Sequence, residues 1–359
     1  MSYSLIKKSL RTGLSLRKMN VEDYFYKVRF EGENIPPLFP EHQQEDNFRH
    51  YHTLTKQEYS REKVKDYCEM ILNPGTLLQG LVAIRKIMCK QNPPIEEFIS
   101  DEAAKRIIKI LKEEKDMIII NEILWICVNL ASSEDEDNTA FLFKNNIIEI
   151  AIEKMGKRKN TEIIKNFIYL IGNLCCEKDM IMKIVELGAF DSMLELLSGE
   201  YYVQLFTEIL WAIKNILKGY MISYNHSEKL VKLLITYVKK RVHLEDCLTI
   251  LASIVEMTES MIIPILINED LETELMGLLD NAIYFDYALI MIGNLISIDD
   301  NYTNRFIENG IIEHLYNKLK TSNSPNQKKE ICWTLSNLSC SNTLIQQKFF
   351  EIKGDRKST

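Results

Sequence analysis

Pairs of an aromatic residue and an asparagine, four positions apart, recur along this sequence. Residues four apart share one face of a helix, so the two side chains of each pair would project together. An asparagine amide carries both a donor and an acceptor, so it can pair with the N–H and the C=O of an extended peptide. An indole face can hold the alkyl stem and the cation of a lysine or arginine. The pairs therefore predict a surface that binds an extended, basic peptide. The four pairs are Trp125 with Asn129, Tyr169 with Asn173, Trp211 with Asn215, and Trp333 with Asn337.

The asparagine position repeats at a nearly constant interval. Asn294 is a fifth copy, four residues after Ile290, and Ser253 is a weakened copy, four residues after Thr249. Successive copies lie 44, 42, 38, 41 and 43 residues apart. A period of roughly 40–47 residues is typical of armadillo and HEAT arrays, which are built from stacked helical repeats.

The pattern within each period favours the three-helix armadillo unit. Apolar residues at three- and four-residue spacing predict helices over 147–155 and 163–175. Gly188 and Gly310 fall where a short first helix would turn into the second. We therefore predict an all-α fold, a right-handed armadillo-repeat superhelix (α-solenoid) of about six to seven repeats. The array would span residues 61–350 and precede a polar tail at 351–359. The aromatic and asparagine residues would lie on the third helices and line the concave wall.

Packing is the competing explanation for these residues. A single tryptophan or asparagine on a helix more often packs or caps than binds a ligand. Packing, however, needs no asparagine at this position, and burial of an unpaired amide is costly. Repetition in phase therefore favours the ligand-binding interpretation.

Composition and charge exclude several classes of protein. The chain has 359 residues, 46% of them apolar, and a formal net charge of −7. This charge disfavours nucleic acid as a partner and suits a basic ligand. No stretch is long and apolar enough to cross a bilayer, so no membrane partner is expected. The eight cysteines form no CxxC pair and most lie in apolar stretches, which indicates reduced thiols that act as small hydrophobic side chains.

Catalytic and metal-binding patterns are missing from the sequence. There is no P-loop and no GxGxxG, and the six histidines lack metal-ligand spacing. His50 and His52 flank a tyrosine without a further histidine nearby. We therefore predict no catalytic residue, no metal and no cofactor, and a binding protein rather than an enzyme.

Three segments resemble the importin alpha (karyopherin alpha) family. They are Lys329–Leu338, Trp125–Ser132 and Asn92–Phe98, and the resemblance covers roughly residues 75–350. It implies a nuclear import adaptor. Such an adaptor binds the basic localisation signal of a protein cargo in its groove, links the cargo to importin beta, and works in the cytoplasm and the nucleus.

The resemblance also implies which residues contact the peptide. Those that match the family's major site are Trp125, Asn129, Ser132, Asn166, Tyr169, Asn173, Glu177, Trp211, Asn215, Lys218 and Asp246. Those that match its minor site are Asn294, Glu330, Trp333 and Asn337. Glu177 falls at the acidic position that pairs with the most buried lysine of the signal. Lys218 stands where the family has an arginine, and Ile290 replaces a family arginine at the minor site.

The first 60 residues lie outside the repeats. Residues 1–30 resemble the family's importin-beta-binding segment, with basic residues at Arg17, Lys18, Lys27 and Arg29. Aromatic and apolar residues among them equally suit an amphipathic arm that packs on the first repeat or on another partner, and both interpretations stay open. Residues 31–60 carry three prolines and many polar residues, which predicts a linker.

Departures from the family leave a second function open. The fourth repeat has lost both members of its pair, and the arm is short and diluted. The sequence also ends soon after the sixth clear repeat, whereas the family has about ten. The alternative function is a scaffold subunit of a larger assembly, for example a cytoskeletal or ciliary one, that has left transport.

Overall fold

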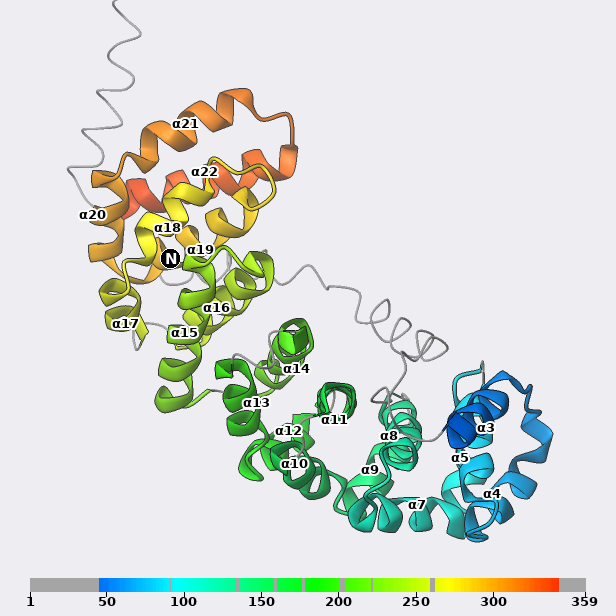
Figure 1. The fold of residues 1–359 in the computed structure, drawn as a ribbon. Helices are drawn as coiled ribbons and strands as arrows, with labels where there is room; N and C mark the ends of the chain where they lie inside the picture. Colours follow the sequence, from blue (N-terminus) through cyan, green and yellow to red (C-terminus); the bar gives the residue numbers. More distant parts are fainter. Residues whose placement is uncertain are drawn as a thin grey trace, which may run out of the picture. The chain divides into compact units, whose positions relative to one another are not determined.

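Helices form every regular element in the part of the chain that the computed structural model describes. The described residues are 45–341, apart from 91, 133–135, 158–159, 176–177, 200–203, 221 and 259–261. They divide into two compact units, residues 45–220 and 222–341, which we call the N-terminal unit and the C-terminal unit. Each unit is a stack of helical repeats (Figure 1).

The N-terminal unit contains three complete three-helix repeats after an initial helix pair. The pair is α4 (Val64–Leu72) and α5 (Leu77–Met88), which follow α3 (Glu45–Lys56) and the 3-10 turn η3 (Arg61–Lys63). The repeats are α6 (Ile95–Ile99), α7 (Glu102–Glu113) and α8 (Met117–Ala131); α9 (Glu136–Lys144), α10 (Ile147–Lys157) and α11 (Thr161–Leu174); and α12 (Lys178–Glu186), α13 (Ala189–Ser198) and α14 (Phe206–Leu217). The predicted three-helix armadillo unit is therefore confirmed.

The C-terminal unit contains two complete repeats after a two-helix fourth repeat. The fourth repeat is α15 (Tyr224–Lys239) and α16 (Leu244–Thr258). The complete repeats are α17 (Ile263–Asn268), α18 (Leu271–Leu278) and α19 (Phe285–Ile298); and α20 (Asp300–Glu308), α21 (Ile311–Thr321) and α22 (Pro325–Ser341). The repeat that lost its Trp and Asn in the sequence is thus also the one that departs in structure.

The third helices pack on one another in sequence order. In the N-terminal unit α5, α8, α11 and α14 form a consecutive row, and α7, α10 and α13 form a second row (Figure 1). In the C-terminal unit α16, α19 and α22 form the corresponding row. On α8, Ile123, Leu124 and Val128 are fully buried. Burial of each such side chain contributes about 1.5–3 kcal/mol, so the apolar faces of the third helices hold the repeats together.

A left-handed residue separates the first helix from the second in four repeats. Gly188 (φ 90°) and Gly310 (φ 80°) take this position, as the sequence predicts. Asn146 (φ 56°) and Asp270 (φ 53°) take it in the second and fifth repeats. Asparagine and aspartate tolerate this conformation better than most side chains do. The fourth repeat has no such turn within α15, which runs unbroken over sixteen residues.

The second half of the segment predicted as a linker, residues 31–60, is structured instead. Helix α3 buries Tyr51 and Leu54. Lys86 on α5 donates from Nζ to the main-chain oxygen of Thr55 at 2.8 Å. Contacts with helices far along the chain therefore fix a stretch whose local sequence is that of a linker. The arm at residues 1–30, the first part of the linker and the tail at 351–359 lie outside the described residues.

No helix in the described ranges is long and apolar enough to cross a membrane. In the same ranges, no group of three or more His, Cys, Asp or Glu side chains could hold a metal ion.

The predicted burial of cysteines is confirmed at several positions. Cys68 and Cys127 are buried, and burial raises the pKa of each thiol to about 12. Cys332, by contrast, is exposed on α22. A thiol with a raised pKa stays protonated at neutral pH and is a poor nucleophile.

Thiol labelling checks this burial. In native buffer at pH 8, iodoacetamide should alkylate Cys332 within minutes and leave Cys68 and Cys127 unmodified, as read by peptide mass spectrometry. In denaturant all three should react. Native-state alkylation of Cys127 at the rate of Cys332 would contradict the buried third-helix core.

Candidate functional site

Three positions recur on one face of each third helix in the N-terminal unit. Counted back from the asparagine, the aromatic residue lies four positions earlier and a polar residue lies seven positions earlier. This spacing places all three on the same side of the helix, and we call them the asparagine, aromatic and polar rows. The rows consist of Glu122, Trp125 and Asn129 on α8, Asn166, Tyr169 and Asn173 on α11, and Glu208, Trp211 and Asn215 on α14.

Asparagines of this row are bonded to the preceding third helix. Asn173 Nδ2 donates to the main-chain oxygen of Val128 at 3.2 Å, and Asn215 Nδ2 donates to that of Gly172 at 3.1 Å. Each acceptor directly precedes the asparagine of the previous repeat. Asn173 and Asn215 are only 1% and 3% exposed, so these bonds are shielded from water. The asparagines therefore have a structural role, and the expectation that packing needs no asparagine here is wrong.

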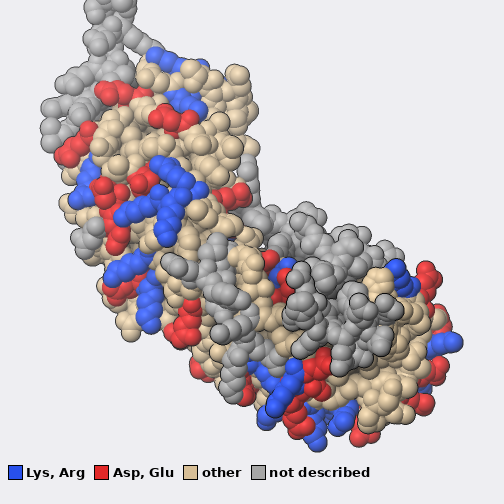
Figure 2. All heavy atoms as spheres, viewed as in Figure 1, with Lys and Arg blue, Asp and Glu red and all other residues tan. Residues whose placement is uncertain are grey.

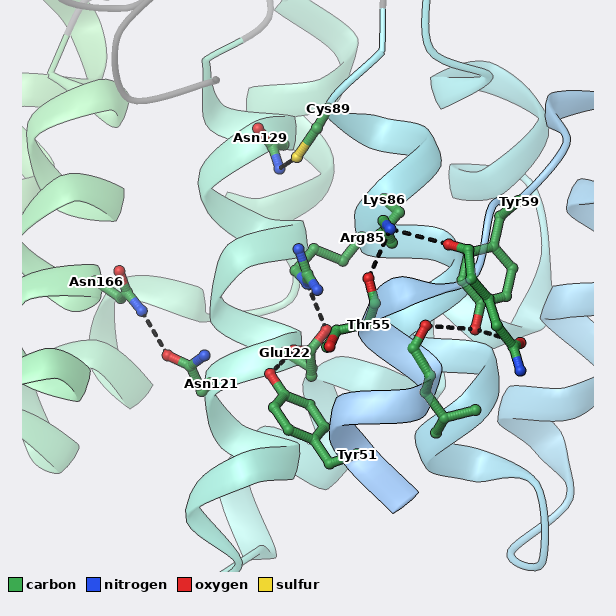
Figure 3. A network of polar contacts seen from close by, with 12 residues as sticks. Tyr51, Thr55, Tyr59, Arg85, Lys86, Cys89, Asn121, Glu122, Asn129 and Asn166 are labelled. Carbon is green, nitrogen blue, oxygen red and sulfur yellow. Dashed lines mark hydrogen bonds and ion pairs between the residues drawn. The ribbon is translucent and has the colours of Figure 1, made fainter. Parts of the chain in front are cut away.

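The remaining amide atoms differ from one repeat to the next. Asn173 Oδ1 is buried without a hydrogen-bond partner among the described residues. Asn215 Oδ1 accepts from Nζ of the exposed Lys218 at 2.8 Å. Asn129 Nδ2 donates to Cys89 Sγ at 3.4 Å, and Cys89 occupies the asparagine position of the initial helix pair (Figure 3). Of these three residues, Asn173 is the one with a buried acceptor that lacks a donor among the described residues.

Two tryptophans of the aromatic row pack directly on glycine. A Cβ added to Gly172 would lie 2.2 Å from Cζ3 of Trp211, and a Cβ added to Gly293 would lie 2.3 Å from Cζ3 of Trp333. Both distances are far inside van der Waals contact. Each indole therefore lies against the main chain of the preceding third helix, at the residue just before its asparagine. A side chain at either glycine would displace the ring.

Tyr169 joins the aromatic residues of neighbouring repeats. Its ring meets that of Trp211 edge to face, with centroids 5.9 Å apart and planes at 77°. Aromatic pairs favour this geometry. Tyr169 is 8% exposed, whereas Trp125 and Trp211 are partly exposed. The two tryptophans are thus partly accessible to a ligand. Tyr169, between them in the sequence, mainly packs against Trp211.

The polar row begins in a buried cluster that includes α3. Glu122 is fully buried; its Oε2 accepts from Arg85 Nε at 2.6 Å and its Oε1 accepts from the Tyr51 hydroxyl at 2.6 Å (Figure 3). Burial and the nearby Glu122 carboxylate raise the pKa of Tyr51. Arg85 stands four residues before Cys89, at the aromatic position of α5. Glu122 is therefore committed to the fold rather than open to a ligand.

The next member of the polar row is also engaged within the protein. Asn166 Nδ2 donates to Asn121 Oδ1 at 2.7 Å (Figure 3). Glu208, the third member, accepts from the Tyr169 hydroxyl at 3.4 Å and remains partly exposed. Of the three, Glu208 is the carboxylate that solvent can reach.

In the C-terminal unit the rows are incomplete. Asn294 Nδ2 donates to the main-chain oxygen of Ala252 at 3.4 Å, which repeats the bond of the N-terminal unit. Thr249 and Ser253, which replace the pair on α16, donate to main-chain oxygens of their own helix at 2.7 and 3.0 Å. Back-bonding of this kind satisfies a hydroxyl without a ligand.

The predicted minor-site residues lie on α19 and α22. Asn294 is on α19, and Glu330, Trp333 and Asn337 fill the three rows of α22. Trp333 Nε1 and Asn337 Nδ2 are buried atoms without a hydrogen-bond partner in the part of the chain that is described. Asp246, predicted with the major site, holds the polar row of α16 and so belongs to the C-terminal unit.

Other predicted residues are placed less fully. Ser132, just after α8, is partly exposed and donates from Oγ to the main-chain oxygen of Asn129 at 2.9 Å. Glu177 lies outside the described residues, as do the arm residues Arg17, Lys18, Lys27 and Arg29.

Glu208 was not among the site residues predicted from the sequence. The pattern that could have found it is the polar row itself, because an acid or amide stands three residues before the aromatic position in five of the six repeats. Those residues are Glu122, Asn166, Glu208, Asp246 and Glu330. Three of them were predicted separately from the family resemblance, without the common spacing that relates them.

The glycine contact gives a first prediction for this face. Gly172→Ala should lower the free energy of unfolding by about 1–3 kcal/mol, because the added methyl overpacks against the Trp211 ring. Urea denaturation followed by circular dichroism measures the change. Gly156→Ala on α10 is the control: nothing lies within 4 Å of its Cβ, so helix propensity should raise stability by up to about 1 kcal/mol. Equal effects of the two substitutions would refute the tryptophan–glycine contact.

The α3 cluster gives a second prediction. Tyr51→Phe should lower the free energy of unfolding by about 1–3 kcal/mol, because it leaves a buried carboxylate oxygen of Glu122 without its donor. The same denaturation experiment applies. Tyr224→Phe, at an exposed tyrosine, should change stability by less than about 0.5 kcal/mol. A neutral Tyr51→Phe variant would show that α3 is not held by this bond.

Comparisons with known proteins agree with this architecture. No family model matches the chain. Importin subunit alpha-1b of Oryza sativa subsp. japonica is 24% identical over 267 residues, which cover 72% of this chain and 49% of that protein. Importin subunit alpha-3 of Arabidopsis thaliana is 23% identical over 273 residues, which cover 71% and 49%. The chain spans about half the length of the curated relatives it matches.

A solved structure matches the fold. The crystal structure of an engineered protein from the Northeast Structural Genomics Consortium superposes with a TM-score of 0.65 at 19% identity, covering 81% of this chain and 72% of that one. At this identity the match concerns the fold alone. Together with the three-helix repeats, it shows an armadillo-repeat fold, and in sequence the chain is similar to importin alpha subunits.

Proposed function

We propose that the chain binds an extended, Lys/Arg-rich segment of another protein along α8, α11 and α14, and acts as a nuclear import adaptor for that cargo. The observation that carries the proposal is the alignment of the aromatic, asparagine and polar rows on three neighbouring third helices. The similarity to importin alpha subunits supports the same class of ligand.

In this proposal each row makes a different contact. Trp125 and Trp211, both partly exposed, hold the alkyl stems and cations of lysine or arginine. Asn173 Oδ1, which lacks a donor among the described residues, accepts a main-chain N–H of the peptide. Glu208 attracts a peptide cation. By the family resemblance, Glu177 and Asp246 do the same.

Charge on the described residues is mixed. Figure 2 shows acidic and basic side chains interspersed where the described residues of this face are visible. The net charge of −7 still favours a basic partner over nucleic acid. Individual carboxylates next to aromatic rings would then select the peptide, rather than the electrostatic field of a large acidic surface.

The remaining parts of the proposal follow from the family. The arm with Arg17, Lys18, Lys27 and Arg29 would link the chain to importin beta, and the chain would work in the cytoplasm and the nucleus. Ser132 and Lys218 would flank the peptide, and the residues Asn294, Glu330, Trp333 and Asn337 would form a second peptide site. The role is binding, without a catalysed reaction.

One observation favours the alternative function, a scaffold subunit of a larger assembly. The amide nitrogens of Asn173 and Asn215 are bonded to the preceding repeat, so part of the asparagine row serves the fold. Affinity purification of the tagged full chain separates the two functions. Recovery of importin beta supports the adaptor, whereas a stable stoichiometric assembly without importin beta supports the scaffold.

Peptide binding is the central test of the proposal. A fluorescein-labelled peptide with five consecutive basic residues should bind the full chain at 50 mM salt, as measured by anisotropy. Binding should weaken as salt rises, because exposed charges are screened within about 8 Å at 0.15 M. Glu208→Gln should weaken binding about 2- to 10-fold, the range of one partly exposed charged contact.

Glu186→Gln on α12 serves as the matched control. It removes the same charge from an exposed acid outside the rows and should change affinity less than twofold. A peptide with glutamine in place of each lysine should not bind. Absence of binding by the basic peptide at low salt would overturn the proposal.

A further inference from the structure

Lys165 of α11 lies beside the aromatic and polar rows, where a peptide cation is expected. Its Nζ is 5.8 Å from the centroid of the Tyr169 ring and 4.0 Å from Oε1 of Glu208 on the next third helix. Lys165 and Tyr169 are four residues apart on α11, which places them on one helix face. A lysine of the protein itself therefore contacts both an aromatic face and a carboxylate.

The two groups that contact this ammonium, Tyr169 and Glu208, form one cluster with Trp211. The Tyr169 hydroxyl donates to the same Oε1 of Glu208 at 3.4 Å, and Trp211 meets the Tyr169 ring edge to face. We call Tyr169, Glu208 and Trp211 the cation cluster. The Lys165 side chain is 30% exposed and that of Glu208 is 16% exposed, so the cluster opens to solvent on the side of the lysine.

No other lysine–aromatic contact among the described residues involves the aromatic row. The other four join Lys183 to Phe143, Lys240 to Tyr237, Lys318 to Phe285, and Lys320 to Tyr316. The contact at Tyr169 is therefore specific to the proposed peptide-binding face.

We propose that Lys165 is an internal ligand of the cation cluster, which the ammonium of a peptide lysine displaces on binding. This inference rests on the proposed function and adds a regulator of affinity to it. The cluster can hold a peptide ammonium because it already holds an ammonium of the protein itself. Lys165 lowers the affinity of the face for basic peptides. Weakly basic segments therefore do not bind.

The geometry makes the internal ligand displaceable. A separation of 4.0 Å is long for an ion pair, and 5.8 Å is near the outer limit of a cation–π contact. Lys165 shares a helix with Tyr169, which restricts how closely its ammonium can approach both groups. A peptide lysine arrives from outside the helix and is free of that restriction. Since the apparent affinity scales with the fraction of clusters that are unoccupied, removal of the internal ligand should tighten peptide binding.

The test compares charge-matched variants of the full chain with the five-basic-residue peptide. Lys165→Met keeps much of the alkyl stem and removes the ammonium; it should tighten binding about three- to tenfold. Lys165→Arg retains a cation and should bind like the wild type. Lys109→Met, at an exposed lysine of α7, removes the same charge away from the rows and should change affinity less than twofold. In a Glu208→Gln background the gain from Lys165→Met should disappear.

Peptide position supplies a second check. In a series of peptides, one lysine at a time is replaced by norleucine. The gain in affinity from Lys165→Met should disappear for one peptide only, the one that lacks the lysine that occupies the cluster. A gain that is the same for every peptide, or equal in Lys109→Met, would mean general charge repulsion and would overturn the inference.

The outcomes separate the inference from the proposed function. Wild-type binding with no gain in Lys165→Met overturns the inference and leaves the function standing. No binding by wild type at low salt overturns the proposed function, even where Lys165→Met binds. No binding by either protein overturns the proposed function, and the inference with it.

Discussion

Helix α14 is held to α11, the third helix before it, at a single main-chain position. At residue 172 the carbonyl accepts from Asn215, while the missing side chain of Gly172 makes room for the Trp211 ring. The acceptor and the contact surface are both main chain, so the contact requires a glycine at residue 172 but depends little on the other side chains of the preceding helix. A regular stack of repeats therefore survives extensive change of sequence, and the rows that could contact a peptide stay in register.

This arrangement gives the same residues two tasks. The asparagine nitrogen serves the fold and its oxygen is the atom that a ligand could use, while the tryptophan packs on glycine with one side and exposes part of the other. The fourth repeat differs on both counts: Thr249 and Ser253 bond back to their own helix, and the helix α15 runs unbroken. Loss of the pair thus accompanies loss of the regular repeat.

The period of the asparagine position predicted the repeats and the third helices correctly, because both are set by local spacing along the chain. The contacts between repeats were not predictable in this way. Asn173 and Val128 are 45 residues apart, and Tyr51 and Glu122 are 71 apart, so no local pattern relates them. For the same reason α3 was predicted as linker, although its Tyr51 completes a buried cluster with Arg85. The peptide contacts of the candidate site remain predictions, since they depend on a partner.

The indole N–H resonances of the three tryptophans test the central claim most directly, because each indole reports on one third helix. With the chain labelled with ¹⁵N-tryptophan and each signal assigned by Trp→Phe substitution, addition of a basic peptide should shift the Trp125 and Trp211 signals in a saturable manner. A glutamine-substituted peptide should leave them unchanged. Saturable binding of the basic peptide that moves neither signal would place the ligand elsewhere and contradict the account of the third-helix face.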